Sequence, residues 1–204
     1  MTAGETISFA TGMGNLIVTE FVSLDGVMED PGGAEDFEHG GWTFEIDRGE
    51  GDKFKLDETM ASDALLLGRR TYEGFAAAWP SREGEFADKF NSMPKYVVSS
   101  RLESPEWNNT TVLTGNVAEA VAKLKREQDG NIVVHGSAQL VQTLLEHDLV
   151  DELRLMLFPV VLGSGKRLFA QTTEKKPLSL AESRTVGDGV TILIYRAGIA
   201  DAAR

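Results

Sequence analysis

The sequence has 204 residues, 42% of them hydrophobic and 25% charged, which is the makeup of one ordinary globular domain. Its formal charge of -12 argues against a nucleic-acid or anionic-membrane surface, because phosphate groups require a basic one, and the absence of cysteine excludes disulfides and thiol nucleophiles. No window approaches the roughly 18 apolar residues of a membrane span. We therefore expect a cytoplasmic protein with a disordered leader over residues 1–13 and a frayed tail over residues 198–204.

The first predicted strand spans residues 16–22 and is followed by the motif SLDG. Residues 28–51 then form a polar, glycine-rich stretch without clear periodicity. Loops of this length are usually functional lids or disordered segments, so we expect a lid that borders the site, anchored by the packing of Trp42, Phe44 and Ile46.

Residues 52–61 carry a weak helical pattern. Asp52, Leu56 and Met60 fall on one stripe, which predicts a carboxylate at the end of an apolar face, partly desolvated and with a raised pKa. The helix dipole alone also favours an aspartate in a first turn. Asp47 or Asp57 could take the same place after a small shift of register.

An unbroken apolar run over residues 64–67 predicts a strand covered on both faces, and Gly68 ends it. Arg69, Arg70 and Thr71 then open a helix whose first amides have no carbonyl partner. This arrangement is typical of an anion site, with two guanidinium groups and a hydroxyl as donors. In the alternative interpretation both arginines are solvated and Thr71 is only a cap.

Helices are predicted to about residue 78 and over residues 83–91, and a strand over residues 96–99. Ser99, Ser100 and Arg101 leave that strand as two hydroxyls and a guanidinium. They form either an ordinary turn or a second phosphate cradle.

A further strand is predicted over residues 110–113, and Asn116 begins a helix with Glu119 three residues on, as in a capping box. The segment NIVVH then predicts a strand, and Gly136 a second anion-facing turn before another helix. His135 at this strand end is either a hydrogen-bonded structural residue or a catalytic one, and no metal constellation accompanies it.

From residue 150 the pattern changes to strands without intervening helices. A long strand is followed by two β-like runs, residues 178–186 and 190–196, joined by Gly187-Asp188-Gly189, a strong hairpin signal. Alternating strands and helices with an antiparallel ending predict an α/β fold with a mixed, mostly parallel sheet.

Five segments, in this order, resemble the dihydrofolate reductase superfamily, and most of all the branch that contains the reductase domain of riboflavin biosynthesis: EFVSLDGVM, LLLGRRTYEGF, KYVVSSRL, NIVVHGSAQL and VDELRLMLFPVVLGSGKRLF. The resemblance covers residues 14–196 and implies one domain, residues 14–197, with a dihydrofolate reductase-like three-layer fold. The SLDG motif and the pair of DEL with LGSGKRLF are its more specific matches.

That family binds NADPH across the C-terminal ends of its strands and transfers hydride to a heterocyclic or ribosylated pyrimidine substrate, so the resemblance implies NADPH as cofactor. It implies cofactor contacts from Phe21, Gly26, Gly68, Arg69, Arg70, Thr71, Ser99, Ser100, Arg101, Gly136, Ser137 and Ala138. Counting back from Gly68, the position of the proton-relay acid falls on Asp52, and Asp25 of SLDG is a second catalytic candidate.

The sequence departs from the folate enzymes at residues 135–138, where His-Gly-Ser-Ala stands in place of a run of glycines. The implied function is an NADPH-dependent reductase of a small pteridine- or ribosylaminopyrimidine-like substrate. The alternatives are a nucleotide- or pterin-binding protein that has lost the chemistry and an interaction protein that uses the sheet edge as a dimer surface. The predicted partners are a small-molecule substrate and, as one possibility, a second copy of the chain.

Overall fold

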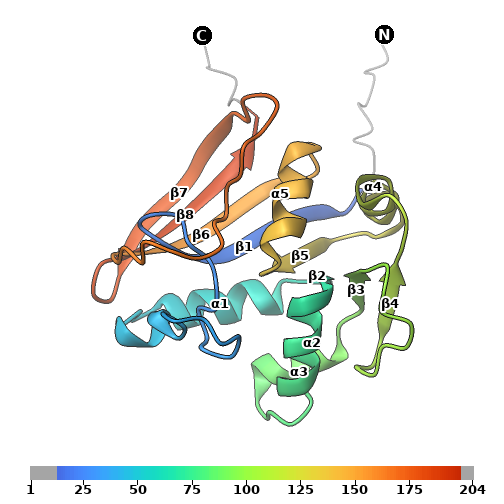
Figure 1. Cartoon of the computed structure of the whole chain (residues 1–204), viewed down its shortest axis with the longest axis horizontal. Coiled ribbons are helices and arrows are strands. Elements are labelled where there is room, and N and C mark those ends of the chain that lie inside the picture. The colour runs from blue at the N-terminus through green and yellow to red at the C-terminus, as the bar shows by residue number, and fades with distance from the viewer. Residues whose placement is uncertain (1–12, 199–204) are drawn as a thin grey trace, which may run out of the picture.

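The computed structural model describes residues 13–198, which form one mixed α/β body around a twisted sheet (Figure 1). The predictions for residues 1–12 and 199–204 lie outside the described residues. Within them, the element order matches the expected strand-helix alternation followed by a hairpin.

The sheet of the described chain has eight strands in the spatial order β4-β3-β2-β5-β1-β6-β8-β7. Neighbours from β4 to β6 are parallel, whereas β8 is antiparallel to both β6 and β7, so the predicted mixed sheet with a C-terminal hairpin is confirmed. The strands are β1 (Asn15–Ser23), β2 (Ala64–Gly68), β3 (Lys95–Val98), β4 (Thr110–Leu113), β5 (Asn131–His135), β6 (Glu152–Phe158), β7 (Leu178–Val186) and β8 (Val190–Ala197).

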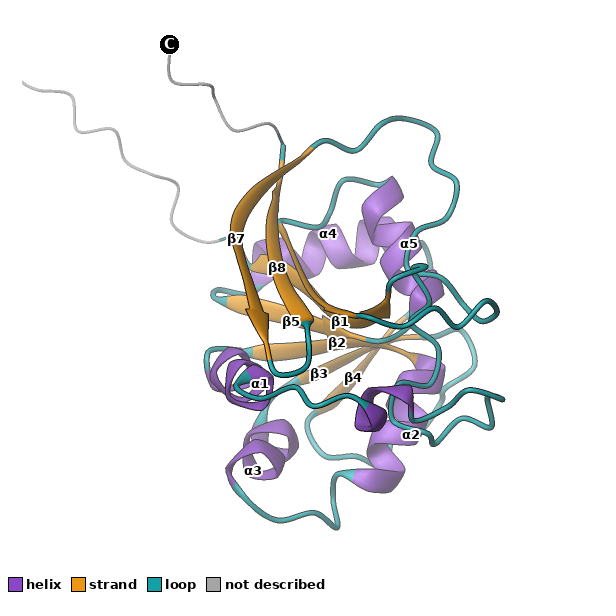
Figure 2. Ribbon diagram, turned by 90° about the vertical axis from the view of Figure 1, so that its left-hand side faces the viewer, coloured by secondary structure: helices purple, strands orange, loops and turns teal. Residues whose placement is uncertain are grey.

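Helices cover both faces of the sheet, which gives the three layers. Figure 2 shows α4 and α5 on one side and α1, α2 and α3 on the other. The helices are α1 (Gly51–Met60), α2 (Arg69–Ala78), α3 (Glu85–Ser92), α4 (Val117–Glu127) and α5 (Ala138–Glu146), with a short 3-10 helix η1 (Trp42–Glu45) before α1.

The face under α4 and α5 is an apolar core. Leu16 and Val18 of β1 pack there with Val121 of α4 and with Val141 and Leu144 of α5, all fully buried. Each such side chain contributes about 1.5–3 kcal/mol by leaving water. The apolar spacing that predicted the inner faces of these two helices was correct, and the Asn116 side chain caps α4 by accepting from the Glu119 amide at 3.2 Å.

The α1 helix turns a different face to the sheet than its pattern suggested. Its buried side chains include Phe54, Lys55 and Glu58, whereas the Asp52 side chain is 69% exposed and Met60 is 41% exposed. The prediction of a desolvated Asp52 is therefore wrong. The reason is that Lys55 and Glu58 pair with each other and so can be buried, a possibility that a count of apolar residues does not detect.

Residues 28–51, expected as a lid, are organised by two buried residues. Asp30 accepts from the amide of Ala34 at 2.6 Å, and the indole of Trp42 donates to the Glu29 carbonyl at 2.9 Å. Trp42 is 2% exposed, so it anchors the stretch as expected, while Phe44 is exposed. Movement of this stretch upon ligand binding stays a prediction.

Candidate functional site

The C-terminal ends of four adjacent parallel strands carry most of the predicted site residues. Residues 99–101, 68–71, 136–138 and 20–26 follow or end β3, β2, β5 and β1, and we call these four segments the strand-end row. Gly68 is the register partner of Val98, and Thr19 that of His135. With neighbouring strands about 4.8 Å apart, the row from β3 to β1 spans roughly 14 Å, long enough for a ligand with several groups in line.

Ser137 connects the turn after β2 with the turn after β5. Its hydroxyl group accepts a hydrogen bond from the Gly68 amide and donates one to Thr71 Oγ1, each at 2.8 Å. A Cβ added to Gly68 would lie 2.9 Å from the Ser137 oxygen, and one added to Gly136, whose φ is +61°, would lie 3.1 Å from Thr71. The glycines therefore allow the two turns to touch, which fixes the N-termini of α2 and α5 beside each other.

The turn after β3 is shaped by Ser99. This buried hydroxyl accepts from the amides of Arg101 at 3.1 Å and Leu102 at 3.0 Å. Ser100 and Arg101 are exposed beyond it. Ser99 thus holds the turn, while the other two side chains face outward.

The arginines of the row differ in their pairing. Arg69 forms an ion pair with Glu73 one turn along α2, at 2.7 Å. Within residues 13–198, no ion pair involves Arg70 or Arg101. Two uncommitted guanidinium groups therefore stand at neighbouring strand ends.

Asp25 joins two motifs that lie far apart in the sequence. It accepts from the Ser23 hydroxyl at 2.7 Å and from the amides of Leu162 and Gly163 at 3.1 and 2.9 Å. These hydrogen bonds, the one from Ser23 above all, lower the pKa of Asp25 to about 2. Asp25 is therefore a carboxylate at neutral pH that fixes a turn, and its assignment as a catalytic residue stays a prediction.

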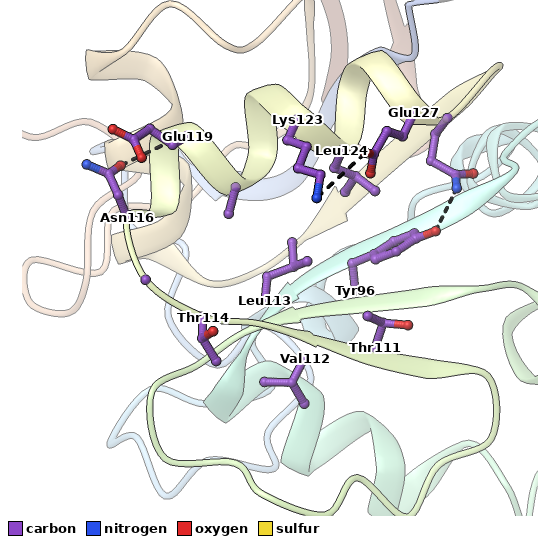
Figure 3. A pocket seen from close by; sticks show the side chains of 13 residues that line it. Tyr96, Thr111, Val112, Leu113, Thr114, Asn116, Glu119, Lys123, Leu124 and Glu127 are labelled. Carbon is purple, nitrogen blue, oxygen red and sulfur yellow. Dashed lines mark hydrogen bonds and ion pairs between the residues drawn. The ribbon is translucent and has the colours of Figure 1, made fainter.

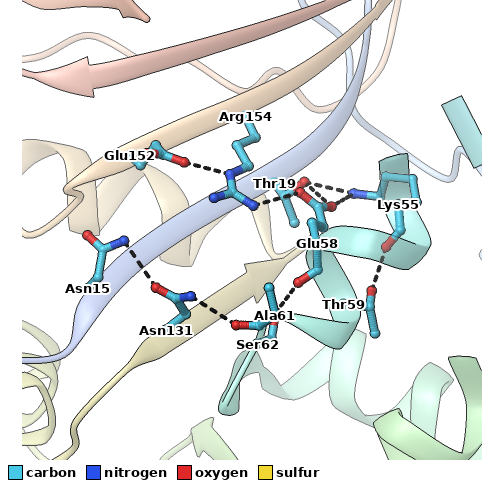
Figure 4. A network of polar contacts seen from close by, with 10 residues as sticks. All are labelled: Asn15, Thr19, Lys55, Glu58, Thr59, Ala61, Ser62, Asn131, Glu152 and Arg154. Atoms are coloured by element: carbon cyan, nitrogen blue, oxygen red, sulfur yellow. Dashed lines mark hydrogen bonds and ion pairs between the residues drawn. The ribbon is translucent and has the colours of Figure 1, made fainter. Parts of the chain in front are cut away.

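The face of β1 under α1 holds a network of buried charges (Figure 4). Lys55 donates to Thr19 Oγ1 at 2.7 Å and also to Glu58, which accepts from the Thr19 hydroxyl at 2.7 Å. Arg154 approaches Glu58 Oε2 at 3.6 Å and pairs with Glu152 at 2.6 Å. The network binds α1 to β1 and β6 through charged groups that compensate one another.

Phe21, at the C-terminal end of β1 on this face, contacts two cations. The Arg48 guanidinium is 5.5 Å and the Lys55 ammonium 5.1 Å from the ring centroid, and Phe158 contacts the ring edge-on at 5.7 Å. Phe21 is half-buried, so this ring closes the apolar part of the site on the side of β6.

None of the three aspartates considered for the acid is desolvated. Asp52 pairs with Arg48 at 2.9 Å and is exposed, Asp57 pairs with Lys53 and is exposed, and Asp47 accepts from the Gly49 amide at 2.9 Å. The acid assigned by counting back from Gly68 is thus not in the strand-end row.

The buried carboxyl of the row is Glu20, which sequence reasoning missed. It is 6% exposed, and its Oε2 accepts from the Gly136 amide at 3.1 Å. Burial raises the pKa of Glu20 to about 8, against the lowering effects of Lys55 and of the Gly136 amide. The sequence contained a signal for this residue, because Glu20 is a charged residue inside the apolar run LIVTEFV.

His135 is the second titratable group at this point. Its ring lies 5.3 Å from Phe90 and 6.4 Å from Phe75, and its Nε2 is shielded from water without a hydrogen-bond partner. Burial, aided by Lys55, lowers the pKa of His135 well below its ordinary value. The imidazole is therefore neutral at pH 7.

A separate cleft of about 570 Å³ lies between α4 and the sheet edge (Figure 3). Tyr96 of β3 forms part of its wall, where its hydroxyl accepts from the Gln128 amide group at 2.7 Å, and the ion pair of Lys123 with Glu127 lies on the helix side. The cleft extends from Thr114 along α4, and neither Gly136 nor Glu20 is among the residues that line it. In the part of the chain that the structure describes, no helix is long and apolar enough to cross a membrane.

These features define an α/β protein of the dihydrofolate reductase type of fold, with a polar row at the C-terminal ends of its parallel strands. The family model of the RibD C-terminal domain matches residues 15–192, and the chain belongs to that family.

Two curated relatives and several solved structures are similar over nearly the whole chain. The uncharacterized protein YyaP of Bacillus subtilis (strain 168) is 31% identical over 185 residues, covering 88% of this chain and 93% of its own length. The uncharacterized protein YwjB of the same organism is 31% identical over 176 residues, covering 86% and 94%.

Among solved structures, a putative riboflavin biosynthesis protein from Shewanella sp. PV-4 is 23% identical with a TM-score of 0.71, covering 91% of this chain and 99% of that one. Dihydrofolate reductase from Enterococcus faecalis, complexed with NADP(H) and RAB-propyl, is 15% identical with a TM-score of 0.57, covering 93% of this chain and 100% of that one. At these identities the two structures establish the fold that the sequence predicted.

Proposed function

We propose that the protein is an NADPH-dependent reductase that transfers hydride to a small heterocyclic substrate of pteridine- or ribosylaminopyrimidine-like type. The observation that carries the proposal is the strand-end row. Arg101, Arg70 and the Gly136 turn follow the adjacent strands β3, β2 and β5, and Glu20 lies near the end of the next strand, β1. Membership of the RibD C-terminal domain family supports the same chemistry.

The residues of the row fit such a cofactor. Two helix N-termini, those of α2 and α5, are held together by Ser137 and offer amides to anionic groups. Arg70 and Arg101 add uncommitted positive charge in a chain of net charge -12. Glycines at residues 68 and 136 let the two turns contact each other through Ser137 and Thr71. When bound, the nicotinamide would supply the hydride, and the protein would orient it and exclude water.

The α1 side of the row would then receive the substrate. Phe21 is a half-buried aromatic ring on this side, and Lys55, 5.1 Å from its centroid, is hydrogen-bonded to Thr19. Residues 28–51 lie before α1 and are the segment proposed to close over this side. Ser100 and Arg101, in this proposal, bind the 2′-phosphate that distinguishes NADPH from NADH.

The test is a fluorescence titration with NADPH and NADH followed by assays on a panel of dihydropterins and aminopyrimidinediones. Arg101→Ala should weaken NADPH binding tenfold or more and leave NADH binding nearly unchanged, because a charged hydrogen bond contributes about 1.5–3 kcal/mol. Arg70→Ala should weaken both cofactors, since it would serve the phosphates that they share.

Arg126→Ala is the matched control, because this exposed arginine lies in the last turn of α4 and so at the opposite end of the strands. Equal losses for both cofactors in Arg101→Ala would remove the assignment of the 2′-phosphate to this turn. Cofactor binding without turnover of any compound would favour a binding protein of the same fold.

A further inference from the structure

Glu20 occupies a place in the sheet where a side chain can reach a ligand at the strand ends. β1 pairs with β5 only as far as Thr19 and His135, and β1 continues to Ser23. Glu20 is the first residue past the end of β5, and its carboxyl turns into the space that β5 leaves, where the Gly136 amide donates to Oε2 at 3.1 Å. The carboxyl is therefore inside the strand-end row, beneath the turn between β5 and α5.

One oxygen of this carboxyl is left without a partner. Glu20 Oε1 is shielded from water and makes no hydrogen bond. Two other side-chain atoms within residues 13–198 share this state: Glu58 Oε2, which has Arg154 at 3.6 Å, and His135 Nε2, whose ring packs against Phe90. Lys55 donates to Thr19 and Glu58, and Glu58 is held by Thr19 and approached by Arg154. A buried oxygen without a partner is costly, so its persistence beside a candidate ligand site indicates that a ligand atom completes it.

The charges around Glu20 favour a neutral acid. Burial raises the pKa of Glu20 to about 8, Lys55 and the Gly136 amide act against this rise, and Glu58 adds to it. Lys55 and Glu58 both come from α1, and the neighbouring His135 of β5 is itself neutral because burial lowers its pKa. At neutral pH Glu20 therefore holds a proton, and Oε1 can carry it as a donor.

We propose that Glu20 is the proton donor of the reductase site, acting through Oε1 on the ring nitrogen of a substrate that has a carbon–nitrogen double bond. The proposal rests on the proposed function. As hydride from the reduced nicotinamide adds to the carbon, the bond between Glu20 Oε1 and its proton breaks and the proton joins the nitrogen. The nicotinamide is oxidised, the substrate is reduced, and the carboxylate regains a proton from water.

The first arm of the test asks whether Glu20 holds a proton, and it needs no substrate. Infrared spectra of the full chain at pH 7 should contain a neutral-carboxyl band that is lost above pH 8 and in Glu20→Gln. Asp52→Asn is the matched control and should keep the band, because Asp52 is exposed and paired with Arg48. Absence of the band in the wild-type protein overturns the proposal whether or not NADPH binds.

The second arm asks whether the acid faces the ligand. Addition of NADPH together with 7,8-dihydrobiopterin should shift the band, because Oε1 gains a partner. Binding seen by NADPH fluorescence without any shift overturns the proposal and leaves the cofactor assignment standing.

The third arm is NADPH oxidation with the pterin and pyrimidinedione panel. Glu20→Gln should lower turnover by about 100-fold or more while NADPH affinity stays within about twofold, and wild-type turnover should fall above pH 8. Asp52→Asn should stay within twofold. If the wild-type protein shows the neutral-carboxyl band but turns over no compound, both the reductase function and the proton-donor role of Glu20 are contradicted. If Glu20→Gln turns over substrate normally, only the proton-donor role is contradicted.

Discussion

The two faces of the central strand β1 are stabilised by different interactions, apolar packing on one face and paired charges on the other. Under α4 and α5, Leu16 and Val18 pack in an apolar core with Val141 and Leu144. Under α1, Thr19 takes part in a buried network of Lys55, Glu58 and Arg154 (Figure 4). On the charged face the loss of one partner leaves a buried charge unpaired, which is costly, so this network fixes α1 on the side of the proposed substrate.

The largest expected effect comes from breaking the charged face. Glu58→Ala should destabilise the protein by about 3–5 kcal/mol, because it leaves Lys55 buried without its carboxylate. Denaturation by urea, followed by circular dichroism, measures this. The double variant Lys55→Met, Glu58→Leu should lose less than Glu58→Ala alone, since no charge is stranded; an equal or greater loss would show that packing rather than charge dominates this face.

A truncated side chain on the apolar face gives a loss of stability with which the loss in Glu58→Ala can be compared. Leu144 is fully buried in α5, and Leu144→Ala should cost about 2–5 kcal/mol, near the middle of that range, by lost burial and a cavity. The same denaturation curves apply. This loss should be the same at low and high salt, and a clear salt dependence would contradict its assignment to apolar burial.

Glu20 should make the stability of the protein depend on pH, an effect that is separate from the packing of either face of β1. Its folded-state pKa of about 8 lies above the ordinary value of 4.5, so the native state binds more protons than the unfolded state between these limits. Stability should therefore fall as pH rises from about 5 to 8, by at most about 4 kcal/mol. Thermal unfolding across this range measures the slope, and Glu20→Gln should flatten it; an unchanged slope would assign the dependence to other groups.

The smallest effect is expected at the exposed end of α1. Asp52 pairs with Arg48 in solvent, and exposed ion pairs contribute about 0–1 kcal/mol. Asp52→Asn should therefore change the urea midpoint very little. A loss comparable to that of Glu58→Ala would mean that Asp52 belongs to the buried network after all.

Most of the fold could be predicted because its signals are local. The strand ALLLG, the inner face of α5 and the hairpin at residues 187–189 each follow from apolar spacing or turn chemistry, and the structure places them within a residue or two of the prediction. Such patterns need no knowledge of the rest of the chain.

The site was less predictable because its key groups depend on distant partners. Lys55 and Glu58 are buried only because Thr19 and Arg154 meet them, and Glu20 is placed by the end of a strand more than a hundred residues away. The spacing of Asp52, Leu56 and Met60 predicted Asp52 as the acid instead, although Asp52 lies on the exposed face of α1. Asp25 was found as part of SLDG, but its partners Leu162 and Gly163 could not be known from the motif.

The place of β1 in the sheet has a consequence for synthesis on the ribosome. This strand is made first among those described, yet its two neighbours, β5 and β6, begin at Asn131 and Glu152. At about 5–20 residues per second, roughly 7–30 s pass before the ribosome has added both partners. During that time the nascent chain carries the apolar strand LIVTEFV with both edges unpaired. β1 therefore cannot pair with its neighbours until β5 and β6, the fifth and sixth strands in the chain, have been made.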